Sequence, residues 1–131
     1  MRFSKVAAIA MIACGVVAVR AQETRDCPRC AEWNAPQPPF KLFGNSYYVG
    51  PHGVSSVLIT SPGGHVLIDG GLAESAPVIA GHIRELGFRI QDVKLIVTSH
   101  VHFDHAGGVA ELQRLSGAAV AASPLSAPVL E

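Results

Sequence analysis

The sequence has few charged and few aromatic residues. Of its 131 residues, 15% are charged and 6% are aromatic, and the formal net charge is zero with histidine neutral. It contains no stripe of lysine and arginine with interleaved aromatics, the pattern that marks a nucleic-acid-binding surface. We therefore expect no nucleic-acid partner. The length and the 49% hydrophobic content instead predict a folded globular protein of about one small domain.

The sequence also lacks an apolar run long enough to span a bilayer. Its main apolar run, residues 6–19, has 14 residues, whereas a spanning helix needs about 20. The run follows a basic start and leads to a small residue, Ala21, which predicts a signal peptide over residues 1–21 and export to the periplasm or the outside. Lipoprotein cleavage at Cys14 and a retained anchor are the alternatives. After cleavage, the mature form is expected to have no membrane segment.

Cysteine is scarce, and the sequence has no second CxxC pair that could complete a four-cysteine zinc site. The one pair, Cys27 and Cys30 in "CPRC", lies in a polar, proline-rich stretch, residues 22–39, which we interpret as an irregular N-terminal arm. In an oxidising compartment this spacing predicts a local disulfide between the two cysteines. Trp33 in the same arm is interpreted as an apolar plug against the domain, with ligand stacking as the alternative.

A regular pattern begins at Phe40. Short, largely apolar stretches bounded by Gly, Asn and Pro predict strands in residues 40–44, 46–50, 55–60, 65–69, 93–99 and 118–123, with a hairpin turn at 61–64. Apolar residues at helical spacing predict a helix from about Glu74 to Leu86 that Gly87 ends, a short helix over about residues 108–115, and the start of another after residue 123. This order indicates an α/β (α+β) fold with a mixed sheet and packed helices.

The chemistry is concentrated in residues 98–108, "TSHVHFDHAGG". Because the chain stays extended after a strand, His100 and His102 are expected to project to the same side. Two such imidazoles can chelate a zinc ion at about 2.0–2.1 Å. Asp104 and His105 lie a turn further on and can reach a second metal, so that both metals could share one activated water. This density of ligands directly after an apolar strand argues against surface histidines.

Asp69 ends the earlier apolar strand, before two glycines. A carboxylate there can accept a hydrogen bond from a ligand histidine and fix its tautomer, or it can be a plain turn residue. Gly107 and Gly108 keep side chains away from the point where the next helix starts. The other histidines are isolated and the tyrosines fit strand positions, so no functional role is expected for His52, His65, His82, Tyr47 and Tyr48.

"SHVHFDH" matches the H-x-H-x-D-H signature of the metallo-β-lactamase superfamily, and "VLIDGG" resembles its strand that ends in aspartate. The stretches "WNAPQPPFKLFGNSYYVGPHGVSSVLITSPGGHVLIDGGL" and "LGFRIQDVKLIVTSHVHFDHAGGVAELQRLSGAAVAAS" resemble β-lactamases of subclass B3. The resemblance covers residues 27–131. It implies the N-terminal half of an αββα sandwich and a hydrolase that confers resistance to β-lactam antibiotics.

The resemblance also implies roles for single residues. His100 and His102 would bind one zinc ion, Asp104 and His105 would bind a second, and Asp104 would orient the attacking nucleophile. Asp69 would support a ligand from outside the metal's coordination sphere. The substrate would be a small β-lactam, and the protein is expected to be a monomer.

The sequence departs from the family's pattern in one respect. The family has one further histidine for each zinc and a second sheet-and-helix half, both downstream, whereas no histidine follows His105 here. We therefore expect residues 40–131 to form a partial domain of a truncated or incompletely recorded protein, inactive by itself. Two alternatives stay open: another hydrolase of the superfamily, such as a thioesterase or lactonase, and a non-catalytic fragment.

Overall fold

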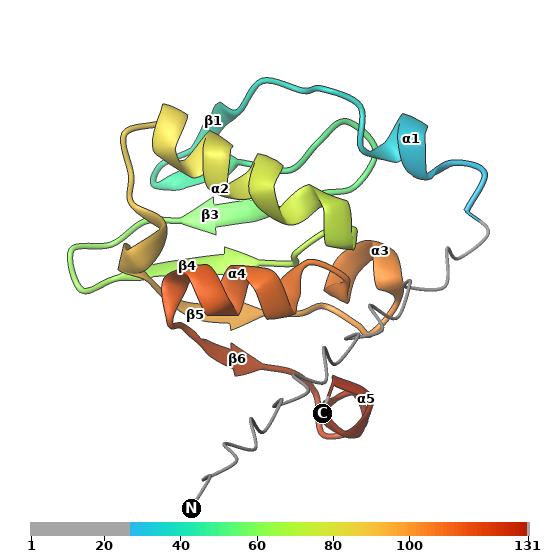
Figure 1. Cartoon of the computed structure of the whole chain (residues 1–131). Helices are drawn as coiled ribbons and strands as arrows, with labels where there is room; N and C mark the ends of the chain where they lie inside the picture. The colour runs from blue at the N-terminus through green and yellow to red at the C-terminus, as the bar shows by residue number, and fades with distance from the viewer. Residues whose placement is uncertain (1–26, 131) are drawn as a thin grey trace, which may run out of the picture.

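The computed structural model describes residues 27–130, which form a sheet with helices packed on it (Figure 1). The predicted signal peptide, residues 1–21, lies outside the described residues, as does Cys14 with its alternative cleavage. Within residues 27–130, no helix has the length and apolar content needed to cross a membrane.

The first four strands form an antiparallel meander, and the last two join it in parallel. The meander consists of β1 (Phe40–Phe43), β2 (Ser46–Tyr48), β3 (Val57–Ile59) and β4 (His65–Ile68). β5 (Val93–Val97) pairs with β4, and β6 (Ala119–Ala121) pairs with β5. The order across the six-stranded sheet is the order along the chain. The mixed sheet expected from the sequence is thereby confirmed.

The helices are α1 (Cys30–Trp33), α2 (Ala76–Glu85), α3 (Phe103–Ala106), α4 (Val109–Ser116) and α5 (Ala127–Leu130), with 3-10 turns η1 (Ala73–Ser75) and η2 (Ile90–Asp92). Pro77 lies in the first turn of α2, where a missing N–H costs little, and Gly87 follows its end with a φ of 84°. The sequence predicted α2, α4 and α5. It did not predict α1 or α3. The arm that was expected to be irregular therefore contains one helical turn.

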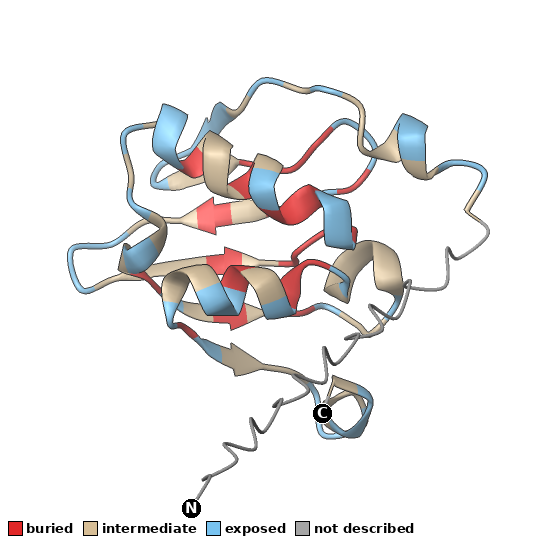
Figure 2. Ribbon diagram, viewed as in Figure 1, coloured by how far each residue is buried: buried red, intermediate tan, exposed pale blue. Residues whose placement is uncertain are grey.

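The core lies between one face of the sheet and the helices α2 and α4 (Figure 2). Residues that pair in register across five strands point to this face: Tyr47, Leu58, Leu67, Ile96 and Val120. Ile79 and Ile83 of α2 pack on them, together with Leu112 of α4, and all three side chains are fully buried. Period-two alternation in the strands and period-3.6 spacing in the helices therefore meet in one core.

The opposite face of the sheet carries a second set of apolar side chains. They alternate with the core residues and are only partly buried: Val57, Ile59, Val66, Ile68, Leu95 and Val97. In the αββα sandwich expected from the sequence, a second layer would pack on this face. Because β4 and β5 are parallel, their carboxyl ends lie side by side at one edge of the sheet. Asp69 follows directly from the end of β4. Residues 98–108, which we call the histidine loop, follow directly from the end of β5.

Two glycine pairs allow the segments after β4 and β5 to approach closely. A Cβ atom on Gly108 would lie 2.3 Å from the Gly70 carbonyl oxygen, and one on Gly70 would lie 2.8 Å from Val109 N. Gly70 N donates to the His105 carbonyl oxygen at 2.7 Å, which fixes the histidine loop against the turn after β4. The glycines thus do more than clear the start of α4, because they form the contact between both functional segments.

The contact predicts that Gly108→Ala lowers the free energy of unfolding by about 1–3 kcal/mol, since the new methyl group meets backbone rather than a flexible side chain. Gly81→Ala is the matched control, because a Cβ atom there meets nothing within 4 Å in the middle of α2. It should stabilise the protein by about 0.5–1 kcal/mol. Urea unfolding measures both changes, and equal effects of the two variants would contradict the close-approach argument.

Candidate metal centre

The histidine loop leaves β5 in an extended conformation. Thr98 Oγ1 donates to the His100 carbonyl oxygen at 2.7 Å, and His102 has extended dihedral angles, φ −62° and ψ 145°. The His100 and His102 rings lie side by side, with centroids 4.7 Å apart. The side chains therefore share one side of the loop, as the extended geometry requires.

A single turn of helix, α3, brings the other two ligand candidates back toward His100. The amides of His105 and Ala106 both donate to the His102 carbonyl oxygen at 2.9 Å, which closes the turn. The His105 ring centroid comes within 4.1 Å of the His100 ring centroid. Donor atoms of His100, Asp104 and His105 then lie within 4.8 Å of one another.

The three-donor group of His100, Asp104 and His105 suits a zinc ion. It combines two imidazole nitrogens with a carboxylate oxygen, which are ordinary zinc ligands. Within residues 27–130 it is the one group of three or more such donors close enough to hold a metal. His102 stands beside this group, against the His100 ring, rather than within it.

Asp69 links this group to the sheet. The residue is buried, with 6% of its surface exposed, and its backbone is left-handed, with a φ of 61°. Oδ1 accepts from Ser99 N at 2.7 Å, and Oδ2 lies 2.8 Å from Ser99 Oγ and 2.9 Å from His105 Nδ1. A proton on His105 Nδ1 is held by this carboxylate, which leaves Nε2 free as a metal donor on the side of Asp104 Oδ2, 3.6 Å away.

Ser99 also belongs to the candidate site, although the sequence pattern did not point to it. Its hydroxyl donates to Asp69, so its lone pairs are available to His100 Nδ1, 3.1 Å away. This contact favours the His100 tautomer whose Nε2 is a free donor. A hydroxyl residue directly before the first histidine was the available signal. Serine after a strand is too common to carry that inference alone.

The histidines and tyrosines for which no role was expected lie outside the three-donor group. His82 Nδ1 hydrogen-bonds the Val49 carbonyl oxygen at 2.9 Å, and His52 is exposed. His65 packs edge-on against Phe88, as Tyr47 does. Tyr48 donates to the Pro51 carbonyl oxygen, and burial raises the pKa of its hydroxyl above the ordinary value.

A cavity of about 460 Å³ lies away from the metal centre. It is lined by residues 61–65, 87–89, Asp92 and Lys94, at the amino ends of β4 and β5. The three-donor group lies at the carboxyl ends of the same strands. The cavity is therefore not part of the candidate site.

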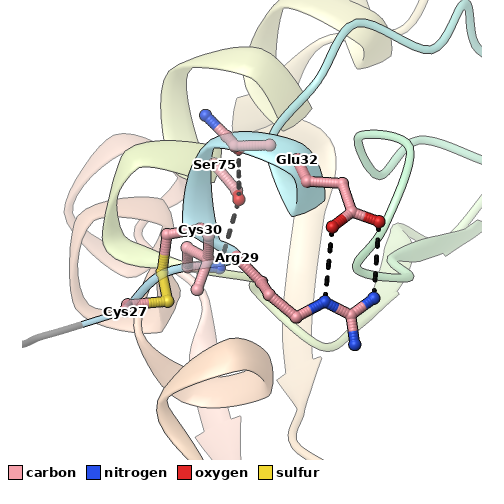
Figure 3. Close-up of a disulfide and its surroundings, with 7 residues drawn as sticks. Cys27, Arg29, Cys30, Glu32 and Ser75 are labelled. Carbon is pink, nitrogen blue, oxygen red and sulfur yellow. Dashed lines mark hydrogen bonds and ion pairs between the residues drawn. A yellow bond between two sulfur atoms is a disulfide. The ribbon is translucent and has the colours of Figure 1, made fainter.

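The structure joins Cys27 and Cys30 in a disulfide at the start of the arm (Figure 3). Trp33 is half-buried against Gly53, in keeping with its interpretation as a plug. Its ring also lies 6.4 Å from the ring of Phe103, the first residue of α3.

Asp69→Asn should lower zinc affinity about 10–100-fold, because an amide cannot accept all three hydrogen bonds of the carboxylate. Asparagine tolerates the left-handed backbone at this position, so the turn itself is expected to survive. Competition with a chromophoric chelator measures the affinity. The control is Asp92→Asn, the same change at the amino end of β5. Unchanged affinity for Asp69→Asn, or an equal loss in the control, would refute the role of Asp69.

Comparison with known proteins finds metallo-β-lactamases of similar sequence and fold. MEM-A1, a subclass B3 metallo-β-lactamase isolated from a soil metagenome library, is 66% identical with a TM-score of 0.74, over 75% of this chain and 37% of that chain. The Rm3 metallo-β-lactamase is 70% identical with a TM-score of 0.76, over 78% and 38%. A curated relative, the N-acyl homoserine lactonase AttM of Rhizobium radiobacter, is 40% identical over 40% of this chain and 28% of its own length.

The chain spans less than two fifths of the length of each of these three relatives. Its match to the family itself is broader. The sequence profile described as "Metallo-beta-lactamase superfamily" covers residues 49–131, which include Asp69 and every residue of the histidine loop. This chain therefore belongs to the metallo-β-lactamase superfamily.

Proposed function

We propose that this chain is the N-terminal part of a zinc-dependent β-lactam hydrolase similar to subclass B3. The observation that carries the proposal is the three-donor group, held by Asp69 at the carboxyl ends of β4 and β5. High identity to solved metallo-β-lactamases supports β-lactams as the substrate class.

In the complete domain the four donors would divide into two pairs, one for each of two zinc ions, so the three-donor group would contribute to both sites. His100 and His102 would hold one ion, and Asp104 and His105 would hold the other. The chemistry that bound zinc supplies is Lewis acidity at the lactam carbonyl and a nucleophile from water at neutral pH. Asp104 has two carboxylate oxygens, so one can bind metal while the other orients the attacking water. Ser99 would keep His100 in the tautomer that binds metal, and Asp69 would do the same for His105.

We further propose that the protein acts as a monomer on small β-lactams after export to the periplasm. The apolar run at residues 6–19 supports export, and the disulfide between Cys27 and Cys30 suits an oxidising compartment.

A lactonase is the second candidate. The observation that favours it is the 40% identity to the AttM lactonase over part of the chain. The same four donors would serve a lactone or a β-lactam, because both are attacked at a cyclic carbonyl. The ligand set therefore does not separate the two substrates, and a direct comparison of substrates is needed.

The test joins this chain to the C-terminal portion of Rm3, the relative it matches over 38% of that protein's length. With zinc, the chimera should hydrolyse a chromogenic cephalosporin faster than an acyl homoserine lactone or a thioester. Asp104→Asn in the chimera should reduce cephalosporin turnover about a hundredfold or more, and a chelator should abolish it. Turnover of the lactone or thioester without the cephalosporin would contradict the proposal.

A protein of these 131 residues alone should show little or no β-lactam hydrolysis. It supplies four donors for two ions, whereas a catalytic zinc usually has three protein ligands. It also leaves the apolar sheet face of β3, β4 and β5 partly exposed. Cephalosporin turnover and zinc content by mass spectrometry measure this. Two tightly bound zinc ions per chain together with hydrolysis would refute the expectation.

A further inference from the structure

The arm before β1 is closed on itself by several contacts. The disulfide between Cys27 and Cys30 spans the start of α1, and the Cys30 amide donates to the Cys27 carbonyl oxygen at 3.1 Å. Arg29 pairs with Glu32 at 3.3 Å (Figure 3). Its guanidinium group also lies 5.3 Å from the centre of the Trp33 ring. A four-residue helix is too short to be stable by itself, so these contacts are what hold α1 in shape.

The arm is also fixed to the loop between β2 and β3. Gly53 N donates to the Trp33 carbonyl oxygen at 2.9 Å, and His52 N donates to the Ala35 carbonyl oxygen at 3.0 Å. A Cβ atom on Gly53 would lie 2.5 Å from Trp33 Cα, so the two backbones are in direct contact. The backbone of Trp33 is therefore fixed against the loop at Gly53, which limits where its ring can lie.

One route leads from the arm to the first residue of α3. The Trp33 ring lies 6.4 Å from the Phe103 ring at a tilt of 35°, a separation typical of packed aromatic pairs. The next two residues of the helix are Asp104 and His105, which contribute two atoms of the three-donor group.

A second route leads from the arm to the other end of α3. Ser75 is fully buried, and its hydroxyl donates to Asn34 Oδ1 at 2.7 Å and accepts from Leu72 N at 3.1 Å (Figure 3). The backbone beside Leu72 packs directly on Gly107, where a Cβ atom would lie 2.9 Å from Ala73 N.

We propose that the disulfide-closed arm is a positioning element for the metal-binding loop. Trp33 holds the first residue of α3. Asn34 acts through Ser75 and holds the segment that packs on the other end of α3. Together the two contacts set where Asp104 and His105 lie. Neither residue touches the metal or the substrate, and both act through α3. The inference rests on the proposed function, because it takes the three-donor group to be a metal site.

Cobalt(II) is the probe, because its visible absorption reports the arrangement of its ligands and its binding needs no substrate. Trp33 is the one tryptophan of the sequence, so quenching of its fluorescence gives an independent reading beside the loop. Cobalt titration compares the unaltered protein with the double variant Cys27→Ser/Cys30→Ser and with Phe103→Leu, which both retain Trp33. Serine replaces cysteine so that no thiolate near the arm competes for the metal.

Both altered proteins should bind cobalt about tenfold more weakly than the unaltered protein and show a changed absorption band, the size of effect expected for residues that orient ligands. Trp33→Ala should behave alike in the absorption assay, and Trp33→Phe should restore the affinity because it keeps an aromatic ring against Phe103. Val120→Ala, a truncation in β6 beneath α4, is the matched control for a general loss of stability. It should lower the melting temperature and leave the absorption band unchanged.

The outcomes separate this inference from the proposed function. If the unaltered protein binds cobalt and the arm variants bind it equally well, the positioning role is wrong and the metal site stands. If the loss of cobalt affinity follows the loss of melting temperature in the arm variants and in Val120→Ala alike, the arm only stabilises the fold and the inference is overturned. If the unaltered protein binds no cobalt, both the metal site and the inference fail.

Discussion

The candidate site depends on the hydrogen bonds that converge on the Asp69 carboxylate. They join the end of β4 to Ser99, the second residue after β5, and to His105 of α3, which lies 36 positions further along the chain than Asp69. The backbone supports the same junction, since Asp69 N donates to the Val97 carbonyl oxygen at 2.9 Å. Because the carboxylate is almost completely buried, these bonds are stronger than they would be in water and hold both segments in one arrangement.

That junction is possible only because glycines stand where the two segments meet. Gly70 and Gly108 approach so closely that a methyl group on either would meet backbone. The turn after β4, which contains Gly70, and the turn after α3, which contains Gly108, are therefore two halves of one structural unit. The ligands are close together in sequence, but their geometry is set by a contact between segments that are distant in sequence.

The sequence predicted the features that depend on local pattern. Short, near-continuous apolar runs identified β4 and β5, and helical spacing identified α2, because each pattern reflects burial in the core. It did not predict α1 or α3, since four residues carry too little periodicity and both turns are held by tertiary contacts. The residue pattern alone left the role of Asp69 open for a similar reason, and only the family resemblance implied it. A carboxylate at the end of a strand becomes a histidine partner only when the neighbouring strand brings one beside it.

The same distinction explains why Trp33 can have two roles. As a plug it buries apolar surface against Gly53, which the sequence suggested. Its second face meets Phe103, and the neighbouring Asn34 reaches Ser75, 41 positions away, so the arm contacts both segments that meet at the metal centre. A short arm can do this only if its own conformation is fixed, and four residues of helix are too few to be stable without contacts from outside the helix. The disulfide between Cys27 and Cys30 adds a covalent closure to these contacts, so a bond within the arm bears on the geometry of the candidate metal ligands.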